Sequence, residues 1–155
     1  MNIGLIIYSQ TGNTRSVAEK LKDKLSSSGH SAVIDEIVIS GNSPAQPGKF
    51  ELKTVPDPGS YDSVIFGSPV QAFSLNPVMK AYMEKLPVLT GKKVGIFVTK
   101  QLPLLQAGGT GAIAHMKKAC EAKGANVVGT EIVVWSEKKR DKTLKQCVEN
   151  LSKLF

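Results

Sequence analysis

The stretch that decides the fold is Ile3-Gly4-Leu5-Ile6-Ile7-Tyr8-Ser9-Gln10-Thr11-Gly12-Asn13-Thr14, an apolar run followed by polar residues and glycine. A short and nearly continuous apolar run predicts a strand that is covered on both faces. The segment from Asn13 to Ser27 predicts a helix, because apolar residues recur there at helical spacing and Gly29 follows as a stop. The polar residues between them therefore form a turn that joins a strand to a helix.

This turn has the composition of an anion-binding site. The first N–H groups of a helix have no partner within the helix, and the helix dipole adds partial positive charge there. Gly12 lets the backbone approach a ligand closely, and the Ser and Thr hydroxyls add donors. No Lys or Arg lies between Ser9 and Thr14, so we expect neutral donors to hold a single terminal phosphate. A turn of this composition could also serve only as a helix cap.

The rest of the chain alternates apolar runs with helical patterns. The further strand candidates are Ser31–Val38, Ser63–Gly67, Lys93–Thr99 and Asn126–Val134. Further helices are expected from Pro77, after Gly111, and from about Glu137 to Lys153. This alternation predicts a single domain over residues 1–155 of the doubly wound α/β class, a five-stranded parallel sheet of order 2-1-3-4-5 with helices on both faces.

The link from Ile39 to Ser60 is rich in Pro and Gly. It is therefore expected to be mostly irregular, with at most a short helical or extended piece near Glu51 to Val55. In open sheets of this class, ligands bind beyond the carboxyl ends of the strands, where the connections turn opposite ways. The loops that meet at that edge are Ser9 to Thr14, Ser68 to Asn76 and Thr99 to Thr110.

Composition narrows the range of partners. The chain has 155 residues and a net charge of +7, and no apolar run approaches the roughly 18 residues of a membrane span. The N-terminal residues lack the pattern of a signal peptide. Cys120 and Cys147 lie far apart in helical patterns, which predicts packed thiols in a cytoplasmic protein and no metal site. The lysines are not interleaved with aromatic residues, so nucleic-acid binding is not expected.

Other folds with an anion loop after the first strand need residues that this chain lacks. Neither a P-loop nor a Rossmann glycine motif is present. Low-molecular-mass phosphatases need a nucleophilic Cys where this chain has Ser9. Receiver domains need Asp at the ends of the first and third strands, where Tyr8-Ser9 and Gly67-Ser68 stand.

Over its whole length the chain closely resembles the flavodoxins and flavodoxin-like flavoproteins, of the short-chain type. Their signature (S/T)-x-T-G-N-T is met from Ser9 to Thr14. The segment Phe66 to Phe73 is similar to the family's G-(S/T)-P loop, and Asn76 to Lys80 is similar to the P-x-M-K helix that follows it. A third element is Thr99, followed later by Gly108-Gly109.

The resemblance implies FMN as the cofactor, and it implies a role for each of the three loops. Its phosphate would be held by Ser9, Thr11, Asn13 and Thr14 with the backbone N–H groups of Gln10 and Gly12. Its isoalloxazine ring would be lined by Pro69, Val70, Gln71, Ala72 and Phe73. The other side would be closed by Thr99, Lys100 and Gln101, with Gly108 and Gly109 as further candidates.

Several of these residues have a structural alternative. Phe73 is either a ring contact or a core aromatic. Gly108 and Gly109 either contact the cofactor or only start the next helix. Lys100 is either a solvated loop residue or a cation near the negative charge of a reduced flavin, where positive potential would raise the redox potential.

Two functions remain open. The resemblance implies a redox protein that transfers electrons through FMN to protein partners. However, the chain is basic, and the loops 68–76 and 99–110 contain no Asp or Glu. The first of these loops has no Gly, and the second has no aromatic residue. These departures from electron-carrying flavodoxins favour the alternative, an NAD(P)H:quinone-type oxidoreductase acting on small acceptors. In either case the flavin supplies the chemistry, and no catalytic side chain is expected. The sequence leaves the oligomeric state open.

Overall fold

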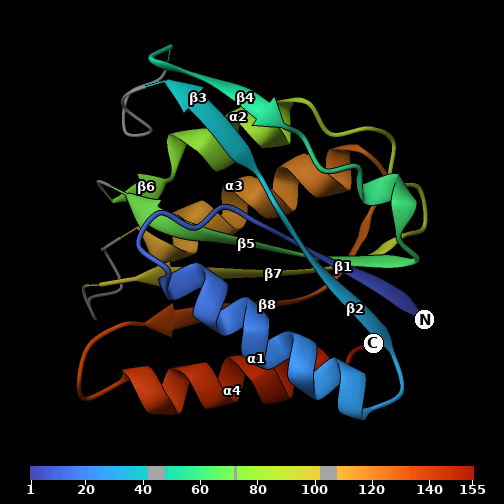
Figure 1. Cartoon of the computed structure of the whole chain (residues 1–155), viewed down its shortest axis with the longest axis vertical. Coiled ribbons are helices and arrows are strands. Elements are labelled where there is room, and N and C mark those ends of the chain that lie inside the picture. Colours follow the sequence, from blue (N-terminus) through green and yellow to red (C-terminus); the bar gives the residue numbers. More distant parts are fainter. Residues whose placement is uncertain (42–47, 72, 102–107) are drawn as a thin grey trace.

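A parallel sheet with helices on both faces forms the centre of the structure, a computed structural model that describes residues 1–41, 48–71, 73–101 and 108–155 (Figure 1). Its parallel strands, in the order β2-β1-β5-β7-β8, confirm the predicted order. The parallel strands are β1 (Asn2–Ile7), β2 (Ser31–Glu36), β5 (Ser63–Gln71), β7 (Lys93–Lys100) and β8 (Asn126–Val134). The helices are α1 (Asn13–Ser27), α2 (Pro77–Glu84), α3 (Gly109–Ala122) and α4 (Arg140–Ser152), with a 3-10 turn, η1, at Pro58–Ser60.

Residue alternation along the strands builds two separate cores. Helices α1 and α4 cover one face of the sheet, called here the α1/α4 face, and α2 and α3 cover the other, the α2/α3 face (Figure 1). In β7, Phe97 packs on the α1/α4 face, whereas its neighbours Ile96 and Val98 pack on the α2/α3 face. Because successive side chains of a strand point to opposite faces, alternate residues of each strand contact different helix layers.

Two glycines in the central strands make room for aromatic rings. A Cβ at Gly4 would lie 2.3 Å from the ring of Tyr61, and one at Gly67 would lie 2.2 Å from the ring of Phe97. The Tyr61 hydroxyl also donates to Asp35 Oδ2 at 2.8 Å. The rings therefore lie directly on the strand backbone, which explains glycine within buried strands.

The link between the second and third parallel strands differs from the prediction. The expected strand Ser31–Val38 is divided: β2 ends at Glu36, and a new strand, β3 (Val38–Gly41), pairs antiparallel with β4 (Phe50–Thr54). An extended piece near Glu51 was predicted, but β3 was not, so the link is more regular than expected. The pairing joins segments separated by a Pro-containing stretch, and local composition does not reveal such a partner.

The carboxyl edge of the sheet is also more ordered than expected. Strand β5 continues past Gly67 to Gln71 and pairs antiparallel with β6 (Ser74–Leu75). Helix α2 begins at Pro77 as predicted, and the Val78 N–H donates to the Asn76 side chain at 2.8 Å. The hairpin and the helix cap together fix the path of the second of the three predicted loops, Ser68 to Asn76.

No helix among the described residues is long and apolar enough to cross a membrane.

Substituting Gly4 by alanine tests the close approach of Tyr61. We expect Gly4→Ala to lower the free energy of unfolding by about 1–3 kcal/mol, because the methyl group would overlap the ring. Gly111→Ala, within α3, is the matched control. A Cβ at Gly111 would meet nothing within 4 Å, so the free energy of unfolding should stay the same or rise by up to about 1 kcal/mol. Urea denaturation measures both, and equal effects would contradict the explanation.

Candidate functional site

A cavity of about 270 Å³ lies at the carboxyl edge of the sheet, where the three predicted loops meet. Its described lining residues are Gln10, Thr11, Asn13, Pro69, Val70, Gln71, Thr99, Lys100 and Gln101. They come from the turn after β1 and from the ends of β5 and β7. Predicted site residues outside this lining are Ser9, Gly12, Thr14, Phe73, Gly108 and Gly109, while Ala72 lies outside the described residues.

The turn after β1 presents the start of α1 to the cavity. Gly12 precedes the helix with φ 93°, and no side chain caps the helix from this position. The Ser9 hydroxyl accepts the N–H of Arg15 at 3.2 Å, and the Gly12 carbonyl accepts the N–H of Ser16 at 3.0 Å. A Cβ at Gly12 would meet nothing within 4 Å, so the space beside the turn is open. This arrangement suits an anion.

A buried hydrogen bond joins this turn to β7. The hydroxyl oxygens of Thr14 and Thr99 lie 3.0 Å apart, and both side chains are almost completely buried. The bond lies on the α1/α4 face, because Thr14 belongs to α1. This hydrogen bond fixes the turn between β1 and α1 relative to the end of β7.

Lys100 is the last residue of β7, and its side chain is only 5% exposed. The alternative of a solvated loop residue is therefore wrong. A Cβ at Gly109 would lie 3.3 Å from Lys100 Cδ, so the lysine stem lies against the start of α3. Burial lowers the pKa of Lys100 from the ordinary lysine value, and the positive charge of Lys139 lowers it further.

The proximity of Lys139 to the site was not predicted. The sequence shows the cluster Lys138-Lys139-Arg140 but not its position. Pairing of Lys100 with Val134 places the segment after β8 beside the end of β7. The Trp135 N–H donates to the Lys100 carbonyl at 2.7 Å, and Arg140 lies over the Trp135 ring at 5.9 Å from its centroid. Strand register was the missing information.

Phe73 occupies an unusual backbone conformation. Its φ is 65°, and its side chain is 66% exposed, so the alternative of a core aromatic is wrong. The Phe73 backbone lies against Gly108, where a Cβ would come within 2.2 Å of the Phe73 carbonyl carbon. Gly108 itself has φ 90° and precedes α3. The second loop is thus held against the start of α3 by a contact that requires glycine.

Carboxylates are absent from the described lining of the cavity. Arg15, which follows the turn, forms ion pairs with Glu36 at 2.7 Å and with Glu19 at 3.2 Å. Lys100 is therefore the charged residue among the described lining residues, and it brings a positive charge to the cavity wall.

Both cysteines are buried away from this cavity, as the sequence predicted. Burial raises the pKa of the Cys120 thiol to about 12 and raises that of Cys147 as well. The thiols thus stay protonated at neutral pH. The described residues contain no group of His, Cys, Asp or Glu side chains that could hold a metal ion.

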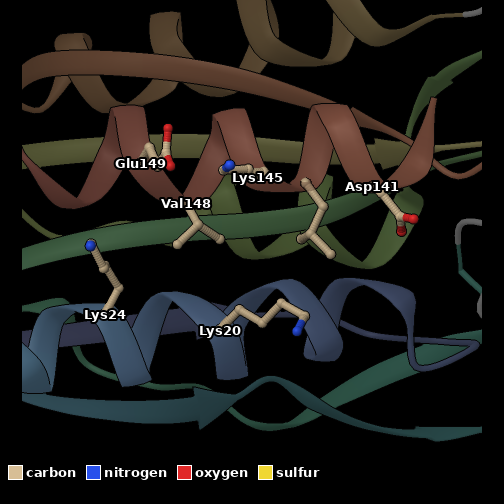
Figure 2. Close-up of a pocket in the computed structure, with 7 residues that line it drawn as sticks. Lys20, Lys24, Asp141, Lys145, Val148 and Glu149 are labelled. Atoms are coloured by element: carbon tan, nitrogen blue, oxygen red, sulfur yellow. The ribbon is translucent and has the colours of Figure 1, made fainter.

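A second groove, of about 380 Å³, lies between α1 and α4 (Figure 2). Side chains from the two helices face each other across it, among them Lys20 and Lys24 from α1 and Lys145 and Glu149 from α4. No strand end or glycine turn contributes to its described lining. It therefore lacks the backbone donors that make the first cavity a candidate ligand site.

The sheet order and the cavity at the switch point between β1 and β5 define a doubly wound α/β protein with a ligand site at the carboxyl edge. The sequence model of the flavodoxin domain matches residues 5–133. The chain therefore belongs to the flavodoxin domain family, a family of FMN-binding redox proteins. No curated protein sequence matches the chain.

Solved structures share this fold over nearly the whole chain. A flavodoxin from Streptococcus pneumoniae TIGR4 superposes with a TM-score of 0.72, at 19% identity and with 100% of both chains covered. Two-electron-reduced flavodoxin from Megasphaera elsdenii gives a TM-score of 0.69 at 24% identity, covering 97% of this chain and 98% of that one. A flavoprotein in complex with FMN from Lactobacillus acidophilus NCFM gives 0.62 at 16% identity, covering 94% and 97%.

Alanine substitutions at two glycines with positive φ separate conformational strain from steric overlap. Gly12→Ala and Gly108→Ala both place a side chain in the left-handed region, but only the second meets the Phe73 backbone. We expect Gly12→Ala to cost about 1 kcal/mol of stability and Gly108→Ala to cost clearly more. Thermal and urea denaturation of the two variants provide the comparison, and an equal loss would argue against the close contact.

Proposed function

We propose that this chain binds FMN in the cavity formed by Gln10–Asn13, Pro69–Gln71 and Thr99–Gln101, and transfers electrons through it to a redox partner. The observation that carries the proposal is the meeting of these three segments beside the start of α1, where the N-cap residue Gly12 has no side chain to occupy the helix N–H groups. Membership of the flavodoxin domain family supports the choice of FMN.

The donor set suits a phosphate monoester at the α1 end of the cavity. Thr11 and Asn13 line the cavity and offer a hydroxyl and an amide, and the first N–H groups of α1 add backbone donors. The open space beside Gly12 leaves room for phosphate oxygens. Ser9 and Thr14 would act mainly as supports, because their hydroxyls already pair with Arg15 and Thr99.

The ring would lie toward the ends of β5 and β7. Pro69, Val70 and Gln71 form one wall there, and Thr99 to Gln101 form another. Bound FMN supplies the redox chemistry through its isoalloxazine ring. The described lining residues include no His, Cys, Asp or Glu, so the chain contributes binding, orientation and electrostatics.

A second candidate function is two-electron reduction of a quinone or a similar small acceptor by NAD(P)H. The observation that favours it is the positive charge of Lys100 at the cavity, where this residue is buried and no described lining residue is acidic. A positive site favours the reduced, negatively charged cofactor and so disfavours a low-potential carrier.

Stepwise anaerobic reduction tests the proposal and separates the two functions. The protein is loaded with FMN and its visible spectrum is recorded after each addition of dithionite. Reduction in two spectral steps, with little NAD(P)H oxidation, supports an electron carrier. Reduction in one step, with rapid NAD(P)H-driven quinone turnover, supports the reductase. Failure of the chain to retain FMN would overturn both.

Removing one hydroxyl tests the phosphate site. We expect Thr11→Ala to weaken FMN binding about fivefold, because a lost hydrogen bond costs about 1 kcal/mol, while riboflavin binding stays unchanged. Fluorescence titration of both ligands measures the effect. Thr130→Ala, at an exposed position within β8 and outside the described lining of the cavity, is the matched control and should leave both affinities unchanged. Equal weakening for FMN and riboflavin would argue against a phosphate role for Thr11.

A further inference from the structure

The end of β7 sends two neighbouring side chains to opposite faces of the sheet. Thr99 lies two residues after Phe97 in β7 and therefore points to the same face of the sheet. Its hydroxyl pairs with that of Thr14 of α1 on the α1/α4 face. Lys100 lies two residues after Val98 and therefore points to the same face as Val98, which packs in the core of the α2/α3 face. The contact of Lys100 Cδ with the Cβ position of Gly109 independently places the lysine stem against α3.

The loop proposed for the flavin ring lies on the same side as Lys100. Val70 packs against the α2/α3 core, and Phe73 lies against Gly108 at the start of α3. The proposed phosphate turn, in contrast, leads into α1 on the opposite face. Lys100 and the second loop therefore flank one part of the cavity, and the phosphate turn flanks another.

We propose that Lys100 stabilises the negative charge that the flavin ring gains on reduction, and that it thereby raises the redox potential of the bound cofactor. This inference rests on the proposed FMN binding. Adding two electrons and one proton to the neutral ring leaves it with one negative charge. The electrons come from the reductant, which is oxidised, and the proton comes from solvent.

The surroundings of Lys100 strengthen this interaction. The residue is 5% exposed, and burial lowers the pKa of its ammonium group, so water screens this charge less than the charge of a surface lysine. No carboxylate in the described lining opposes it, and Lys139 adds a further positive charge nearby. The reduced cofactor should consequently bind more tightly than the oxidised one.

Replacing Lys100 by a neutral polar residue tests the inference. Lys100→Gln is compared with the wild type for affinity toward oxidised and fully reduced FMN and for midpoint potential. We expect the affinity for reduced FMN to fall about tenfold more than the affinity for oxidised FMN, and the midpoint potential to fall accordingly. Lys100→Arg should retain most of the wild-type potential. Lys117→Gln, an exposed α3 lysine outside the described lining of this cavity, is the matched control and should change neither quantity.

Riboflavin, which lacks the phosphate, separates a ring role from a phosphate role. If Lys100 acts on the ring, the variant should show the same redox-dependent loss with riboflavin. Equal losses for both redox states of FMN and none for riboflavin would assign Lys100 to the phosphate and overturn the inference. An unchanged midpoint potential would overturn it too. If Lys100→Gln fails to fold, Lys100→Met provides the same neutral comparison. If the wild type binds neither ligand, the proposed function itself is wrong.

Discussion

Coverage of the parallel sheet on both faces is the constraint on which the rest of this structure depends. Each buried strand must supply one row of apolar side chains to α1 and α4 and another to α2 and α3. The same alternation continues to the strand ends, where the side chains become polar. It directs Thr99 toward Thr14 and directs Lys100 toward α3. Neighbouring residues of the site therefore face opposite helix layers, as the apolar residues of the core do.

The sequence predicted the features that depend on local chemistry. The apolar strands, the glycine turn before α1 and the Pro77 helix start were all identified, because strand burial, turn composition and helix capping are encoded by neighbouring residues. Features that depend on distant partners were missed. Strand β3 exists because it pairs with β4, and Lys139 approaches Lys100 because β8 pairs with β7.

The proposed cofactor site combines neutral donors at one end with a buried cation at the other. Neutral hydroxyls and backbone N–H groups at the start of α1 suit a phosphate without a counter-ion. The positive charge of Lys100 is instead placed beside the loop that we assign to the ring. In this proposal, phosphate recognition and redox tuning are controlled by different strand ends. Each can then change in sequence without altering the other.

The junction between β7 and β8 also gives the molecule an optical reporter. Trp135 is the single tryptophan of the chain, and its backbone N–H donates a hydrogen bond to the backbone carbonyl of Lys100. Its indole ring also lies beneath the guanidinium of Arg140. Indole emission responds to nearby charge, and a yellow chromophore close by would quench it by resonance energy transfer. Intrinsic fluorescence thus provides a label-free signal that originates at the edge of the cavity.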